Sequence, residues 1–417
     1  MKRSVMWIII CLANLFVVAL LGVLLRTKIL YPSIPVDYQN LLNAHSHFAF
    51  AGWLTLVFFI LFIEKFLNRD QREKKIYLYL FSGIQICSVG MLVSFLFQNY
   101  GPLSIFFSTG FILFTYGFSA VFAMDFLKLS QAKMVRIFIG TSLLSLIISS
   151  AGPFYLAYRM ATHQKDVIAF QNAIHFFLHF QYNGFFISAV LALLFSGDNS
   201  FIKPEKEIVV NIFAVINSIS IPATFFSPWL QVNNNGLVIL LRYAGFVSVI
   251  AMLVIFIVIV WTSHKTIARQ ARPAGLLAAY SLAAFILKMI IQILLYMPGL
   301  NKNMLSYRPA IIGYLHLVFL GIATNFILSF LISHRYIPCK NWQSVFSFHF
   351  FAAAIILQEI ILFVNAGFQA MGSAIAIFDK LLWVAAVALL LGISFILGFT
   401  VKKCWPLNSS TLIRETF

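Results

Sequence analysis

Residues 43–53 read NAHSHFAFAGW, so His45 and His47 stand one residue apart at the start of a long apolar segment. Imidazole is costly to place in a lipid bilayer unless it binds a ligand, forms a hydrogen bond or lines a wet cavity. Two questions therefore decide how the fold and the site are interpreted. One is whether this segment crosses a membrane, and the other is which polar residues elsewhere in the chain lie at the same depth.

The composition is that of a membrane protein. The chain has 417 residues, of which 61% are hydrophobic and 10% charged, and its mean hydropathy is +0.94. Repeated apolar segments of about 20 residues exclude a soluble globular domain. We predict an all-α polytopic membrane protein, a single bundle of about twelve transmembrane helices. The predicted spans are roughly 5–26, 44–64, 76–97, 104–126, 136–158, 169–196, 208–229, 237–261, 274–297, 310–333, 345–366 and 380–401.

The net charge of +17 is explained by topology and does not indicate a nucleic-acid partner. Most of the 29 Lys and Arg residues fall in alternate loops, the pattern typical of a cytoplasmic face. This predicts that both termini are cytoplasmic and that the protein is integral to a membrane, which we expect to be a bacterial inner membrane. The four cysteines include no Cys-x-x-Cys-His motif, so no covalently attached c-type haem is expected.

Other histidines lie at a depth similar to that of the first pair. His175 and His179 are four residues apart in the sixth predicted span, which places them on one helix face. His316 follows Tyr314 near the outer end of the tenth span. Several histidines at one level favour metal or haem ligation, while a hydrogen bond between helices is the alternative for each. Two residues on a helix turn about 200°, so His45 and His47 would serve two separate centres.

Buried cations accompany these histidines. Arg242, Lys288 and Arg308 lie in the outer parts of the eighth, ninth and tenth spans or just outside them. Cations near the outer surface are suited to holding haem propionates, and binding to lipid headgroups is the alternative. An ion pair between Lys288 and Glu359 is a further alternative, because an unpaired charge is costly in a membrane.

With these residues in place, the chain resembles the catalytic subunit of the haem–copper oxidases (cytochrome c oxidase subunit I). Residues 45–52 are similar to the His-x-His-x-x-x-x-Gly pattern of that family, and residues 314–321 repeat it with Tyr314 in the first position. The resemblance implies twelve helices with haem in the outer half. It also implies that His45 or His47 joins His316 as an axial ligand of haem b. His175 or His179 would then bind copper or a second haem.

The sequence departs from the family at the copper site. Residues 216–222 of the seventh span read INSISIP and lack the family's histidine pair, and Asn183 stands where a tyrosine would follow His179. Asp125 is the only candidate for a proton-channel acid on the cytoplasmic side. These departures favour a divergent member that transfers electrons or handles O2 or NO, with a quinol or an outer-side cytochrome as donor and with partner subunits.

Two other functions fit the same residues. A proton-coupled membrane transporter would use the buried histidines and charges as its path. A copper- or haem-handling assembly factor, or a protein of the nitric-oxide response, would use His175 and His179 as a metal site.

Overall fold

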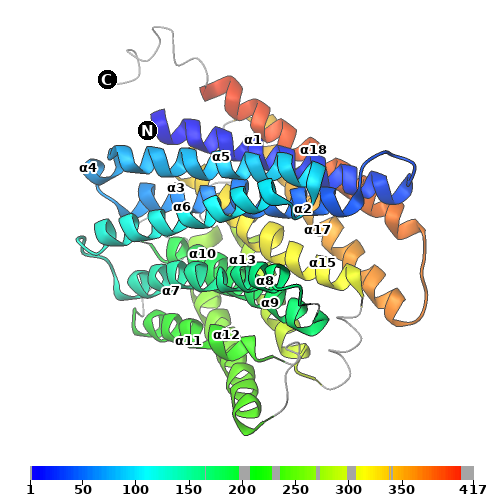
Figure 1. Ribbon diagram of the computed structural model, residues 1–417. Helices are drawn as coiled ribbons and strands as arrows, with labels where there is room; N and C mark the ends of the chain where they lie inside the picture. Colours follow the sequence, from blue (N-terminus) through cyan, green and yellow to red (C-terminus); the bar gives the residue numbers. More distant parts are fainter. Residues whose placement is uncertain are drawn as a thin grey trace.

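The computed structural model describes residues 2–164, 166–196, 207–227, 235–268, 273–297, 307–337, 339 and 341–404. The elements within these ranges are all helical, and twelve spans are long and apolar enough to cross a membrane. The helices run side by side as one bundle (Figure 1). The predicted fold class, an all-α bundle of about twelve spans, is therefore confirmed.

Eight spans are single α-helices and four are composite. The single helices are α1 (Lys2–Leu30), α5 (Lys75–Gln98), α6 (Pro102–Phe126), α11 (Glu207–Phe225), α12 (Gly236–Ala268), α13 (Ala274–Leu294), α17 (Trp342–Ala370) and α18 (Ile377–Cys404). The composite spans are α2 (Tyr38–Phe48) with η1 (Ala49–Thr55) and α3 (Leu56–Phe66), α7 (Lys133–Ser149) with α8 (Ala151–Ala161), α9 (Val167–His179) with η2 (Phe180–Phe186) and α10 (Ile187–Leu194), and α15 (Arg308–His316) with η3 (Leu317–Thr324) and α16 (Asn325–Ser333). Residues 228 and 229 of the predicted seventh span lie outside the described ranges.

The second span begins earlier than the predicted residue 44. Asp37 caps its N-terminus, since the Asp37 side chain accepts a hydrogen bond from the Asn40 backbone N–H at 2.8 Å. The residues that follow the cap are polar and lower the mean hydropathy, so hydropathy does not show the start of this helix. His45 and His47 consequently lie about two turns inside the helix.

Three spans contain a π-helical segment, and these are the spans that carry the histidines of the candidate site. In each case, η1, η2 or η3 begins within two residues of the last of these histidines in its span. The wide π turn disturbs the regular backbone ladder, and such segments often lie at functional sites. A side chain from a neighbouring helix donates to one carbonyl in each segment: Asn14 to Gly52 at 2.7 Å, Ser142 to Phe185 at 3.0 Å and Ser281 to Ile322 at 2.8 Å.

The three π segments also meet one another. Trp53 of η1 donates its indole N–H to the Thr324 hydroxyl of η3 at 3.1 Å. The Phe50 ring lies 4.7 Å from that of Phe319 and 5.7 Å from that of Phe186, measured between centroids. Aromatic pairs at these distances add to the stabilisation from burial. The histidine-bearing spans are thus joined just beyond their histidines.

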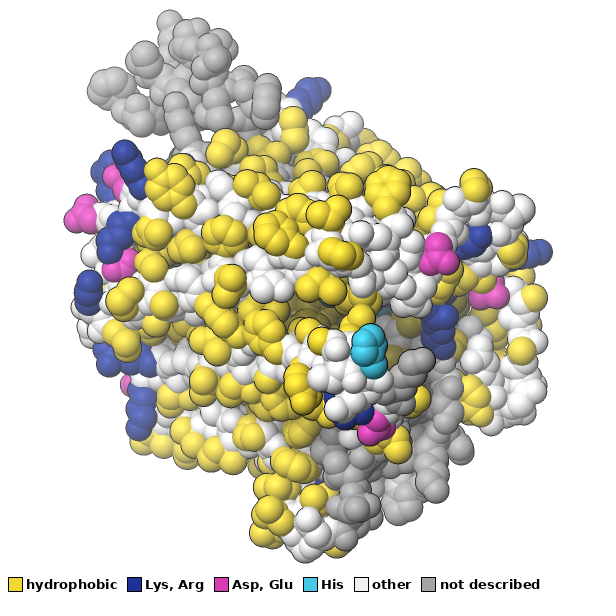
Figure 2. All heavy atoms as spheres, in the orientation of Figure 1, with side chains coloured by type: hydrophobic (Ala, Val, Ile, Leu, Met, Phe, Trp, Pro, Cys, Tyr) yellow, Lys and Arg dark blue, Asp and Glu magenta, His cyan; other side chains and the backbone are white. Residues whose placement is uncertain are grey.

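The two ends of the bundle differ in charge. α1 begins and α18 ends on the same side (Figure 1). Lys and Arg side chains gather at that end of the face shown in Figure 2, while the surface between the ends is largely hydrophobic. Such a band suits contact with lipid. The cytoplasmic placement of this end stays a prediction, and we refer to it as the inner end.

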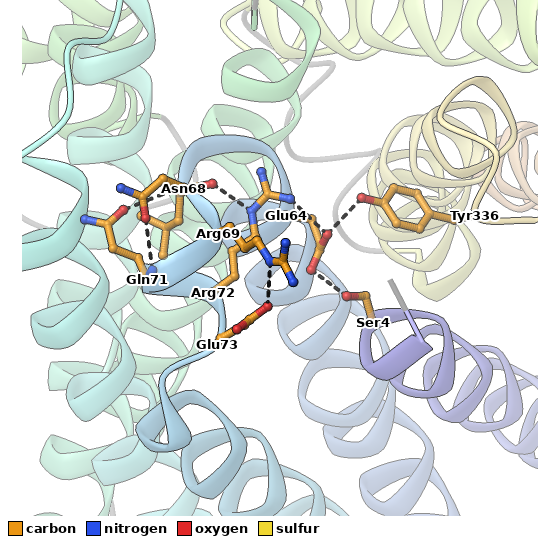
Figure 3. Close-up of polar contacts among 9 residues, drawn as sticks. Ser4, Glu64, Asn68, Arg69, Gln71, Arg72, Glu73 and Tyr336 are labelled. Atoms are coloured by element: carbon orange, nitrogen blue, oxygen red, sulfur yellow. Dashed lines mark hydrogen bonds and ion pairs between the residues drawn. The ribbon is translucent and has the colours of Figure 1, made fainter. Parts of the chain in front are cut away.

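A polar cluster around Glu64 joins three spans at the inner end (Figure 3). The Glu64 carboxylate accepts hydrogen bonds from the hydroxyls of Ser4 at 2.5 Å and Tyr336 at 3.1 Å, and pairs with Arg72 of the short helix α4 (Arg69–Arg72) at 3.3 Å. Burial and the nearby carboxylate of Glu64 raise the pKa of Tyr336, so its hydroxyl stays protonated and donates. This cluster fixes α1, α3 and the end of α16 relative to one another.

Asp125 forms a second connection at the same end. Its carboxylate accepts hydrogen bonds from Lys74 at 2.5 Å and from Tyr77 at 2.8 Å, and Gln71 donates to its backbone oxygen at 2.9 Å. These contacts tie α6 to α5 and α4. The residue that the sequence offers as a proton-channel acid is therefore engaged on both carboxylate oxygens.

Candidate functional site

His45 and His316 form the first half of the candidate site, which we call the His45–His316 pair. The two half-buried rings come from α2 and α15, and the segments that follow them, η1 and η3, contact each other through Trp53 and Thr324 and through Phe50 and Phe319. His45 Nδ1 donates to the Val18 carbonyl oxygen of α1 at 3.0 Å, which places its proton on Nδ1. Within the described residues, Nε2 of each ring makes no hydrogen bond. A ring held through Nδ1 with Nε2 available is the arrangement of a metal-binding histidine.

His316 is held in a similar way by the next span. Gln358 of α17 lies with its amide nitrogen 3.0 Å from His316 Nδ1. A half-turn of the amide exchanges its nitrogen and oxygen, so Gln358 can accept from an Nδ1–H as well as donate to a bare Nδ1. The residues therefore fit a haem iron held by the two Nε2 atoms, each ring being positioned through Nδ1.

A glycine of α1 faces the His45 ring. A Cβ added to Gly22 of α1 would lie 3.5 Å from His45 Cε1. The face shown in Figure 2 is also hollowed near its middle, where hydrophobic side chains surround a recess. Small residues on a helix let a bulky group approach its backbone closely.

His47 points away from the His45–His316 pair. Its ring stacks on Phe95 of α5 at 4.4 Å between centroids, and its Nε2 lies 3.0 Å from the Tyr100 hydroxyl. His45 contacts α1 and His47 contacts α5, as expected from their spacing of two residues. Of the two, the geometry favours His45 as the partner of His316.

Two arginines stand on the spans next to the pair, Arg308 at the start of α15 and Arg26 on α1, and the sequence interpretation named only Arg308. Arg308 donates to the Tyr38 hydroxyl at 2.8 Å, and its guanidinium lies 4.9 Å from the centre of the Tyr38 ring. Arg26 of α1 is half-buried, interacts electrostatically with both His45 and His316, and has no hydrogen bond or ion pair among the described residues. Arg26 also interacts electrostatically with Tyr38 and with the Asp379 carboxylate, but hydrogen-bonds to neither, so its N–H groups are suited to a further carboxylate.

His175 and His179 form the second half of the site, packed against α11. The His179 Nε2 donates to the Ile221 carbonyl at 2.8 Å, and the His175 Nε2 lies 3.4 Å from the Phe225 carbonyl. The two carbonyls are four residues apart, as are the two histidines, so one helix face matches the other. The last carbonyls of a helix have no partner within it, and these side chains help to satisfy them.

The His179 ring is engaged at both nitrogens. Asn183 Nδ2 donates to its Nδ1 at 3.1 Å, and the side chain is only 2% exposed. His175 and His179 lie 5.6 Å apart between ring centroids. No group of three or more His, Cys, Asp or Glu side chains within the described ranges is arranged to hold a metal ion. Binding of copper or a second haem by His175 and His179 stays a prediction.

Two buried tyrosines lie between the halves. The Tyr182 ring lies 6.0 Å from that of His179 and 5.6 Å from that of Tyr314, which precedes His316 by two residues. Both tyrosines are nearly inaccessible, at 7% and 6% exposed. They fill the space between the two groups of histidines.

The other predicted cations lie elsewhere. Arg242 of α12 donates through Nε to the Phe226 carbonyl at 3.0 Å, beyond the end of α11. Lys288 of α13 is buried and donates to Gln292 at 2.7 Å. The ion pair considered between Lys288 and Glu359 is not formed, and both Glu359 carboxylate oxygens lack a partner among the described residues.

Three residues of interest escaped the sequence interpretation. From the sequence alone, Arg26 is the charged residue that ends the first span, and Glu64 is an acid at the membrane interface. Gln358 is one amide among several. The position of Gln358 next to Glu359 in an apolar segment was the one available signal, because polar pairs inside membrane spans are rare. Arg26 and Glu64 stand at helix ends, where charge is common, so composition gives no reason to single them out.

Comparison with known proteins leaves the chain without an assigned family. No protein-family model matches it, and no curated protein matches it significantly. The function must therefore be inferred from the twelve-span bundle and the geometry of its histidines.

Proposed function

We propose that this protein is a membrane haemoprotein that binds haem b between His45 and His316 and transfers electrons within the membrane. The observation that carries the proposal is the His45–His316 pair, in which each ring is held through Nδ1 and neither Nε2 makes a hydrogen bond among the described residues. As a ligand, His316 would carry its proton on Nδ1 and donate it to the amide oxygen of Gln358. Bis-histidine haem cycles between two iron oxidation states without an open coordination position, which suits electron transfer. A membrane quinol or an outer-side cytochrome would be the electron donor.

The protein residues around the pair would orient the ligands and balance charge. The Val18 carbonyl fixes the proton on His45 Nδ1, and Gln358 holds the ring of His316. Such outer partners set ring orientation and ligand basicity. Arg26 and Arg308 would pair with the haem carboxylates at the outer end. The resemblance to the haem–copper oxidases then extends to this haem, while the lack of three clustered ligands among the described residues gives no support for the copper chemistry of that family.

Three single variants test the ligand assignment. We expect His45→Ala and His316→Ala each to abolish the low-spin haem spectrum of the purified protein. His47→Ala is the matched control, since its ring contacts Phe95 and Tyr100 instead, and its spectrum should be unchanged. Loss of the spectrum in His47→Ala, with retention in His45→Ala, would contradict the assignment.

A proton-coupled transporter is the second candidate, and Glu359 is the observation that favours it. This carboxyl is only 7% exposed, and neither of its oxygens has a partner among the described residues. A buried, unpaired acid in a membrane span is suited to binding and releasing a proton. Proton flux in haem-free proteoliposomes that is lost in Glu359→Gln would support this candidate over the haemoprotein.

A further inference from the structure

A small polar cavity lies between η2, α11, α12 and α13. Its volume is about 10 Å³, room for one particle the size of a water molecule. The polar side chains that line it are Asn183, Asn217, Ser220, Thr224, Lys288 and Gln292. The cavity is separate from the His45–His316 pair, so a ligand bound there is independent of the proposed function.

Lys288 brings to this cavity an amine that has no carboxylate partner among the described residues. Its side chain is 4% exposed, and its one hydrogen bond runs to Gln292 Oε1 at 2.7 Å. No carboxylate of the described residues lies within ion-pair distance, since the five ion pairs found there involve other residues. A buried ammonium has three N–H donors and requires a compensating charge in a medium of low polarity.

The free hydrogen-bonding groups of the cavity are mostly donors. Lys288 retains two N–H groups, and the Gln292 amide nitrogen has no acceptor in the described part of the chain. The hydroxyls of Ser220 and Thr224 donate to carbonyls of their own helix, and Asn217 donates to Ser188. These groups therefore leave two donors from α13, one of them charged, directed at the cavity.

One unpaired acceptor, Asn183 Oδ1, lines the same cavity. A water molecule would satisfy it, whereas an anion would not. A buried amine without a counter-ion favours its neutral form, so the anion would bind together with a proton on Lys288. The charge-assisted hydrogen bond formed in this way is stronger than the neutral one that Asn183 Oδ1 would make with a water molecule. We propose that this cavity binds a single monovalent anion of halide size, held by Lys288 and Gln292. The flexible side chains of Met252 and Met289 in the lining allow the small expansion that chloride requires.

Thermal unfolding of the purified full chain tests this site. The midpoint is measured with sodium chloride, sodium bromide or sodium gluconate at equal ionic strength. Chloride and bromide should raise the midpoint with the logarithm of their concentration once it exceeds the dissociation constant, by about 3 °C at about ten times that constant, because a ligand that binds only the folded state stabilises it. Gluconate is too large for the cavity and should give no rise. Equal midpoints in all three salts at every concentration would overturn the proposal.

Variants show whether the ion binds at Lys288. We expect Lys288→Met to lose the chloride-dependent rise, while the control Lys128→Met, at an exposed lysine, keeps it. If Lys288→Met does not fold, Gln292→Leu provides the test, and the chloride concentration at which its midpoint begins to rise should increase about tenfold. An undiminished chloride response in Lys288→Met, or an unchanged onset concentration in Gln292→Leu, would overturn the assignment of this cavity.

Discussion

Replacing His179 with alanine tests the role that the geometry gives this residue. Its ring donates to the Ile221 carbonyl at 2.8 Å, accepts from Asn183 at 3.1 Å, and packs against Phe225 at 5.7 Å between ring centroids. The ring thus joins α9 to α11 and also orients a residue of η2. If the role is structural, the variant should lose stability whether or not copper is present.

The size of the loss can be estimated from these contacts. One hydrogen bond to the neighbouring span and one within the same span contribute roughly 1–3 kcal/mol together, and removal of a buried ring adds roughly 1–2 kcal/mol of lost packing. We therefore expect His179→Ala to lower the free energy of unfolding by about 2–5 kcal/mol. Reversible unfolding in mixed micelles, followed by helical circular dichroism with and without added copper, measures this difference.

A double-mutant cycle isolates one of the contacts. Coupling between His179→Ala and Asn183→Ala should be roughly 0.5–1.5 kcal/mol, the range for a single hydrogen bond within a protein. The structural role is refuted if His179→Ala is less stable than the unmodified protein only when copper is present. Stoichiometric copper in the unmodified protein that disappears in this variant would assign the ring to metal binding instead.

Three further variants probe the contacts around the site. Gln358→Leu removes the partner of His316 Nδ1, so haem affinity in a titration should fall about tenfold or more, and an unchanged affinity would exclude this orienting role. Arg26→Leu removes a cation near the pair, so the reduction potential of bound haem should fall by roughly 50 mV in a redox titration; a rise would contradict the charge argument. Ser281→Ala leaves the Ile322 carbonyl of η3 without its donor and should cost about 0.5–1.5 kcal/mol of stability, whereas Ser394→Ala, which loses only a bond within α18, should cost less.

The sequence is sufficient to predict the twelve spans because hydropathy records the requirement that dominates in lipid, namely an apolar helix long enough to cross. The start of the second span was missed because its first turns are polar and are stabilised by the Asp37 cap. The convergence of the polar residues on one level was also predictable, since helix rise converts sequence number into depth.

The three π segments could not be predicted from hydropathy. η1 and η3 are as apolar as the surrounding helices, and the polar residues of η2 do not distinguish a π turn from an α turn. Donors to these segments, such as Asn14 and Ser281, lie far away in the sequence. The partners of the buried charges could not be predicted for the same reason. Their similar depth suggested that Lys288 and Glu359 could form an ion pair. The rotation of each helix about its axis decides which neighbours a side chain faces, however, and Lys288 donates to Gln292 of its own helix instead.

The sequence was sufficient to identify the histidines of the candidate site, but not to show which of them lie together. His45, His175, His179 and His316 were all identified from their depth, yet the structure separates them into a pair with available Nε2 atoms and a pair bonded to α11. Spacing fixed the opposite directions of His45 and His47, because a helix turns about 100° per residue. Helix packing decides whether His45 or His47 faces α15, and this packing cannot be read from a single sequence.

The central claim is that one haem is held between His45 and His316. It is tested most directly by the absorption spectrum and haem content of the full chain, purified from cells with adequate haem supply. A haem at this position predicts a Soret band, a sharp α-band on reduction typical of low-spin iron, and one haem b per chain by pyridine haemochrome assay. A protein that purifies folded, by its helical circular dichroism, but without a Soret band would contradict it.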